Sequence, residues 1–172
     1  MKHILGIDPG KTGGLALLTQ DGELIRVWDQ PETPEAAADL FLEIRYGKDL
    51  IGALESVHAR GAFSNRGSAS AQANFSLGWS LGGWRYLLAG FQVPYHLVKP
   101  QEWQRLIDTP KPKGPKNSRP GKAALKKWVS GYATRLWPNG EFRGPKGGIL
   151  DGRSDAAVIA ECVRRKVIGG AL

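Results

Sequence analysis

Four acidic residues stand where an acid interrupts an apolar segment or opens a helix: Asp8, Glu55, Asp151 and Asp155. Asp8 ends the run "ILGID" and Glu55 ends the run "LIGALE", positions at which an unpaired carboxylate is costly. Asp151 and Asp155 are four residues apart, so a helix would project both from one face. Carboxylate oxygens are preferred ligands of hard cations such as Mg²⁺ and Mn²⁺. The four acids are therefore the inventory of a two-metal site for such cations.

Each acid has a structural explanation when it is taken alone. Asp8 could cap its own Asp-Pro-Gly turn, and Glu55 could be a surface residue at a strand end. Asp151 and Asp155 could complement the positive end of a helix dipole. The metal-site interpretation is favoured because three separate elements each carry such an acid, and a mixed sheet can bring all three to one edge.

The segment "GIDPGKTGG", residues 6–14, contains the Gly-Lys-Thr of a phosphate-binding loop without that loop's spacing or context. Such a loop has four residues between its glycines and leads from a strand into a helix, whose amides and dipole hold the phosphate. Here three residues separate Gly6 from Gly10, Pro9 removes an amide, and a strand follows. We expect a tight turn that holds Asp8 at a strand end, and no nucleotide cofactor.

The hydrophobic pattern predicts one α/β domain over residues 1–172, with helices packed on a mixed sheet. Strands are expected over residues 3–8, 13–19, 23–29, 50–56 and 91–98. Helices are expected over residues 33–47, 101–107, 123–137 and 151–168, with weak helical periodicity from 68 to 88. The basic, proline-rich segment 108–122 and residues 58–67 and 138–150 are expected to be loops.

The composition indicates a polyanionic partner. The chain has 172 residues and a formal net charge of +8, which favours nucleic acid. No segment approaches the ~18 consecutive apolar residues of a spanning helix, so no membrane partner is expected. The single Cys162 excludes an internal disulfide and a cysteine-rich zinc site. The first residues lack the pattern of a signal peptide, so we expect a cytoplasmic protein.

Basic residues near the acids and in the proline-rich segment are expected to contact DNA phosphates, which makes binding salt-dependent. They are Lys11, Arg60, Arg66, Lys111, Lys113, Lys116, Arg119 and Lys122. Five tryptophans among apolar neighbours are expected in the core or at a dimer interface: Trp79, Trp84, Trp103, Trp128 and Trp137. The small-residue stretch "SLGWSLGGW", residues 76–84, would let two helices approach closely and is the expected dimer face.

Three segments, "GIDPG-x-TGG-LAL", "ALES-VHA" and "D-GRS-DAAVIAE", resemble the RuvC-type Holliday-junction resolvases of the ribonuclease H-like superfamily, which include phage and organellar relatives. The resemblance extends over nearly the whole chain, and its first and last segments are the specific ones. It implies a ribonuclease H-like mixed five-stranded sheet, with three antiparallel strands first, flanked by helices.

The resemblance also implies an activity. A homodimer with two active sites would nick two strands of like polarity in a four-way DNA junction, using two Mg²⁺ or Mn²⁺ ions per site and leaving a 5′ phosphate and a 3′ hydroxyl. Asp8 would match the family's first-strand acid and Glu55 its fourth-strand acid. Bacterial members space the last-helix pair by three residues, whereas Asp151 and Asp155 are spaced by four. Asp155 is the better match, and whether both bind metal stays open.

Three further residues take roles from the same resemblance. Lys99 in "VKPQEWQ" would contact a phosphate, and Lys122 in "GKAALKKW" matches a basic position near the junction centre. Phe63 in "RGAFSNRG" resembles a wedge that some relatives insert into the opened junction, although it could equally pack against the following helix.

Two other functions remain compatible with parts of the sequence. A non-catalytic structure-specific DNA-binding protein would explain the charge but gains nothing from acids clustered near phosphate. An actin-like ATP-binding phosphotransferase lobe has a similar "GID-x-G-x-T" hairpin, but such proteins carry a second lobe and are usually twice this length.

Overall fold

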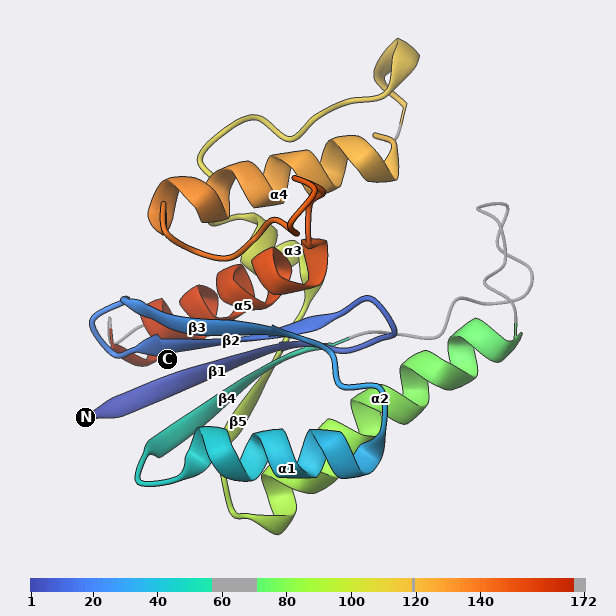
Figure 1. Cartoon of the computed structure of the whole chain (residues 1–172). Helices are drawn as coiled ribbons and strands as arrows, with labels where there is room; N and C mark the ends of the chain where they lie inside the picture. Colours follow the sequence, from blue (N-terminus) through green and yellow to red (C-terminus); the bar gives the residue numbers. More distant parts are fainter. Residues whose placement is uncertain (57–70, 119, 169–172) are drawn as a thin grey trace.

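The computed structural model describes residues 1–56, 71–118 and 120–168 (Figure 1). Its centre is a five-stranded sheet of order β3-β2-β1-β4-β5. The strands are β1 (Lys2–Asp8), β2 (Gly14–Thr19), β3 (Leu24–Asp29), β4 (Asp49–Glu55) and β5 (Tyr95–Val98). β1, β2 and β3 pair antiparallel, whereas β4 runs parallel to both β1 and β5. The predicted mixed sheet with three antiparallel strands first is confirmed.

Five α-helices and a short 3₁₀ turn surround the sheet in the described part of the chain. They are α1 (Pro34–Arg45), α2 (Ala71–Gly90), α3 (Pro100–Gln104), η1 (Pro115–Asn117), α4 (Lys122–Leu136) and α5 (Asp151–Ile168). In Figure 1, α1 and α2 cover one face of the sheet, α5 covers the other, and α4 lies beyond α5 as an outer layer. None of these helices is long and apolar enough to cross a membrane.

Two apolar cores lie on the two faces of the sheet, because successive residues of a strand point to opposite sides. In β1, Ile4 packs toward α5, and Leu5 and Ile7 pack toward α1 and α2. Phe41 of α1 and Trp84 of α2 are buried in the second core, where their rings meet edge to face.

Several predicted boundaries shift in the structure. The strand expected over 91–98 begins only at Tyr95, because residues 91–94 form a turn in which Gln92 has φ 54° and Pro94 has no amide to donate. The stretch of weak helical periodicity is α2, whose N-terminal half projects past the sheet (Figure 1). The helix expected over 101–107 ends at Gln104, and the expected loop 108–122 contains the 3₁₀ turn η1.

The first turn of α5 lies directly against the turn between β1 and β2, because glycines leave room for it. A Cβ on Gly6 would lie 2.0 Å from the carbonyl oxygen of Ala156, and one on Gly152 would lie 2.3 Å from the carbonyl carbon of Gly13. Gly13 and Gly152 also form an isolated parallel bridge. This backbone contact brings the first turn of α5 to the end of β1.

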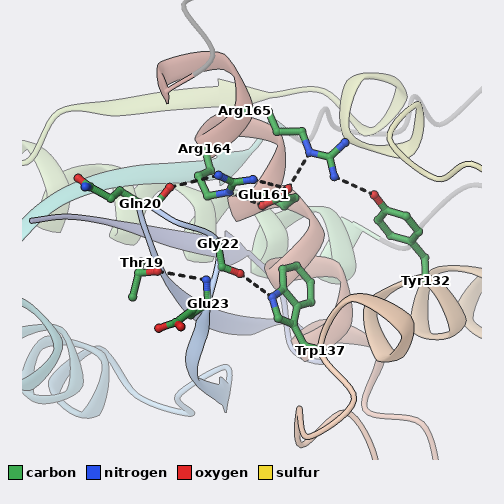
Figure 2. Close-up of polar contacts among 9 residues, drawn as sticks. All are labelled: Thr19, Gln20, Gly22, Glu23, Tyr132, Trp137, Glu161, Arg164 and Arg165. Atoms are coloured by element: carbon green, nitrogen blue, oxygen red, sulfur yellow. Dashed lines mark hydrogen bonds and ion pairs between the residues drawn. The ribbon is translucent and has the colours of Figure 1, made fainter.

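A buried ionic cluster fastens the far end of α5, as Figure 2 shows. Glu161 is 4% exposed and accepts hydrogen bonds from Arg164, at 2.6 and 2.9 Å, and from Arg165, at 2.6 Å. Although burial raises the pKa of Glu161, these two arginines hold it below its ordinary value. Arg164 also donates to the carbonyl of Gln20, and Arg165 to the hydroxyl of Tyr132. The cluster therefore ties α5 to the β2–β3 hairpin and to α4.

Candidate active site

Asp8 and Glu55 lie at the carboxyl ends of two adjacent parallel strands. β1 and β4 pair through Ile7 and Leu54, so the residues that follow these two, Asp8 and Glu55, meet at one edge of the sheet. Burial raises the pKa values of both carboxyl groups, and the neighbouring Glu55 raises that of Asp8 further. Two adjacent buried carboxyl groups resist carrying two negative charges at once.

Asp8 is the centre of the acidic cluster. Burial raises the pKa of Asp8 well above its ordinary value, and the negative charges of Asp155, Glu55 and Asp151 raise it further. All four acids predicted from the sequence therefore lie within electrostatic reach of one another. The cluster takes one acid from β1, one from β4 and two from α5.

Asp155 has a carboxylate oxygen without a hydrogen-bond partner in the described part of the chain. This oxygen, Oδ1, is buried, and no described residue donates to it. Burial and the charges of Glu55 and Asp151 raise the pKa of Asp155 to about 8, although the nearby Lys126 ammonium acts in the opposite direction. A buried, unpaired oxygen among repelling acids fits a hard divalent cation, which would supply the missing charge and ligand.

The carboxylates are not arranged as a finished metal cage. Among residues 1–56, 71–118 and 120–168, no group of three or more His, Cys, Asp or Glu side chains is placed to hold a metal ion as it stands. Asp151 already has a cationic partner, because its Oδ2 lies 2.7 Å from the Nζ of Lys126 on α4. Carboxylate oxygens are donors that suit Mg²⁺ or Mn²⁺. The carboxylate of Asp151, however, is paired with the ammonium of Lys126.

Glu55 is held by a buried indole. The Nε1 of Trp103, on α3, donates to Oε1 of Glu55 at 2.9 Å. Burial raises the pKa of Glu55, whereas the hydrogen bonds from Trp103 and Asp8 lower it. Trp103 belongs to the core, as predicted, but its contact with an acid of the cluster was not foreseen.

The turn that carries Asp8 is fixed from two sides. Gly10 has φ 130°, a conformation that favours glycine, and its amide donates to Oγ of Ser80 on α2 at 3.2 Å. The amide of Gly13 donates to the carbonyl of Gly10, and the chain then enters β2 rather than a helix. The segment is a hairpin turn, as predicted, and not a phosphate-binding loop.

Arg153 positions the first turn of α5 from between its two acids. Its guanidinium forms a bidentate pair with Asp29 at the end of β3, at 2.7 and 2.9 Å. It also donates to the carbonyl of Glu141 at 3.2 Å. The hydrogen bond from Arg153 lowers the pKa of Asp29. Asp151 and Asp155 are thus held against the sheet by a residue that faces away from them.

The predicted DNA-contacting residues divide by position. Lys11 follows β1 and Lys99 follows β5, so both lie at the same sheet edge as the acids and both are exposed. Lys122 opens α4, and Lys113 and Lys116 are exposed in the segment before it. Lys111 is also exposed, but its Nζ donates to Gln104 and lies 5.7 Å from the centre of the Trp128 ring. Arg60, Phe63, Arg66 and Arg119 lie outside the described residues.

Comparison with solved structures identifies the fold. The structure of RuvC from T. thermophilus in complex with a Holliday junction substrate matches with a TM-score of 0.59 and 18% sequence identity, over 98% of this chain and 97% of that chain. The chain has the ribonuclease H-like fold of RuvC. The resemblance predicted from the sequence is therefore confirmed at the level of the fold.

Two more solved structures are similar to this chain. A second Thermus thermophilus RuvC structure gives a TM-score of 0.56 and 19% identity, over 97% of this chain and 96% of that one. The yeast mitochondrial Holliday junction resolvase Ydc2 gives 0.48 and 16%, over 98% and 84%. No protein-family model and no curated protein matches this sequence.

Proposed function

We propose that this protein is a Mg²⁺-dependent structure-specific endonuclease that cleaves four-way DNA junctions. The observation that carries the proposal is the convergence of Asp8, Glu55, Asp151 and Asp155, because burial and then the mutual repulsion of these acids raise the pKa values of Asp8 and Asp155. Four buried acids with only a structural role would destabilise the fold, because burial and repulsion disfavour their charged forms. A bound divalent cation would offset that repulsion. The fold shared with RuvC supports the choice of a junction as substrate.

In this proposal the acids hold metal, and no side chain attacks the substrate. Two bound Mg²⁺ or Mn²⁺ ions would supply an activated water and stabilise the leaving 3′ oxygen, giving 5′ phosphate and 3′ hydroxyl products. Asp8, Glu55 and Asp155 are the ligands, with Asp151 available once it leaves Lys126. Lys11 and Lys99, at the same sheet edge, orient the phosphate, and the basic residues of 111–122 hold the junction arms.

The outer face of α2 is the proposed homodimer interface, which would give two sites for two nicks. Gly78, Gly82 and Gly83 have open space around them, so a second helix can approach closely. Phe75 and Trp79 are 64% and 65% exposed, and their rings stack 6.1 Å apart. Exposed aromatic side chains beside glycines are typical of a surface that another protein covers.

The test of the proposal is cleavage of a synthetic four-way junction with Mg²⁺, compared with a linear duplex of the same length. We expect symmetric nicks in the junction, products that a ligase can reseal, and weak competition by the duplex. Binding should fall steeply with salt, because several lysines and arginines neutralise phosphates. Equal cleavage of junction and duplex would point to a general nuclease, and junction binding without cleavage to a non-catalytic binder.

Replacing Trp103 with Phe is expected to lower kcat for junction nicking roughly tenfold with little change in KM. A hydrogen bond to a charged acceptor contributes about 1.5–3 kcal/mol, part of which holds Glu55 in its metal-binding position. The matched control is Trp84→Phe, because Trp84 is equally buried and donates through Nε1 at 3.0 Å to Gln30, an uncharged residue, instead of to an acid of the cluster. An equal fall in kcat for both variants would show that Trp103→Phe acts by destabilising the fold and not by releasing Glu55.

A further inference from the structure

We infer that Lys126 is an internal competitor for the metal, which keeps Asp151 out of the cation site in the DNA-free protein. The inference rests on the proposed function and assigns to Lys126 the control of that site. Lys126 lies on α4, outside the sheet and its edge, and approaches the cluster because α4 packs on α5. Its ammonium meets Asp151 Oδ2 at 2.7 Å.

The ion pair distinguishes Asp151 from the other three acids. Within the described residues, Asp151 is the acid of this cluster that has a basic side chain within ion-pair distance. Asp8 and Glu55 are adjacent carboxyl groups, and Glu55 accepts a hydrogen bond from Trp103. In the part of the chain that the structure describes, Asp155 Oδ1 has no hydrogen-bond partner. Asp151 is therefore the acid of the cluster that is paired with a cationic side chain, whereas Asp8, Glu55 and Asp155 have no such ion pair among the described residues.

The same ion pair can be displaced. The side chains of Lys126 and Asp151 are 44% and 22% exposed, and ion pairs with this degree of exposure are weak. A divalent ion carries twice the charge of the ammonium and can also be shared with Asp155, one helical turn away. Junction phosphates would attract the exposed ammonium of Lys126. DNA and the metal ion would therefore both favour separation of Lys126 from Asp151.

This arrangement explains why the two acids of α5 are not equivalent. Asp155 is a metal ligand in the free protein, whereas Asp151 becomes one only after Lys126 leaves. The four-residue spacing fits these different roles. Asp151 is the first residue of α5, within reach of Lys126 on α4, and Asp155 lies about one helical turn further along α5. Lys126 is thus a positioning residue that acts through Asp151.

The test measures Mn²⁺ binding to the DNA-free protein by titration calorimetry. Lys126→Met is expected to tighten Mn²⁺ binding roughly two- to tenfold, in keeping with the modest strength of a partly exposed ion pair. Lys126→Arg, which restores the charge, should bind Mn²⁺ as the wild type does. The matched control is Lys127→Met, the adjacent exposed lysine of α4, which should leave the affinity unchanged.

A double-mutant cycle with Asp151→Asn isolates the contact. In the Asp151→Asn background, Lys126→Met should no longer change Mn²⁺ affinity. An unchanged affinity in the single Lys126→Met variant, or an equal gain in both backgrounds, would overturn the inference. Failure of the proposed function has another signature, in which the variants show the expected pattern of Mn²⁺ affinities but the wild-type protein does not cleave the junction.

Discussion

Substituting Asp8 with Asn is expected to reduce Mg²⁺-dependent nicking of a four-way junction by roughly a thousandfold or more while leaving junction binding nearly intact. Asp8 is the acid whose pKa responds to all three others, so the substitution removes the central negative charge of the cluster. Metal ions contribute several kcal/mol of transition-state stabilisation, and each 1.36 kcal/mol changes a rate tenfold. The measurement is single-turnover nicking together with a gel-shift titration in Ca²⁺.

The matched control is Asp39→Asn, an exposed acid of α1 on the far side of the sheet, for which wild-type nicking is expected. Asn has nearly the same shape as Asp, so a loss of nicking with retained binding reflects charge and not packing. Cleavage at the wild-type rate by Asp8→Asn would exclude the acidic cluster as the active site.

The metal-free protein is expected to lose stability as pH rises from about 5 to about 8. Burial and its acidic neighbours raise the pKa of Asp155 from 3.8 to about 8, and they raise that of Asp8 in the same direction. Between the ordinary and the raised pKa, the folded state keeps a proton that the unfolded state releases. Raising the pH therefore favours unfolding, by at most about 1.4 kcal/mol per pH unit for each group.

The measurement is urea denaturation in EDTA across this pH range, for the wild type and for Asp155→Asn. The variant should be more stable at pH 8, by an amount on the order of a few kcal/mol, and its stability should depend less on pH. His3 acts in the opposite direction near pH 6.5, since burial lowers its pKa, but it contributes equally to both proteins. Added Mg²⁺ should stabilise the wild type most. Parallel curves for the two proteins would contradict the prediction.

The placement of Asp8 and Glu55 was predictable from the sequence, because each ends an apolar strand and the carboxyl ends of neighbouring parallel strands share an edge. The hairpin turn after Asp8 was also predictable, since the spacing of Gly6 and Gly10 excludes a phosphate-binding loop. Both predictions depend on short segments whose chemistry is local. The family resemblance implied a five-stranded sheet with three antiparallel strands first, whereas the order β3-β2-β1-β4-β5 was not predicted.

The contacts of Trp103 and Lys126 could not be predicted in the same way. Each depends on how a helix packs beside the acids: α3 beside Glu55, and α4 on α5 beside Asp151. A tryptophan among apolar neighbours indicates the core, and a lysine in a basic segment indicates a phosphate contact. Neither pattern specifies which acid the side chain meets, because helix packing depends on residues far away in the sequence.

The backbone contact between Gly152 and Gly13 has a consequence for how the protein acquires its activity during folding. Asp8 lies on β1 and Asp155 on α5, near opposite ends of the described sequence, so the acids meet only after α5 has docked on the sheet. Contacts of such long sequence separation form late and slowly in folding. A partly folded chain would therefore hold the DNA-binding lysines without an assembled acidic cluster, so that it could bind nucleic acid before it could cut it.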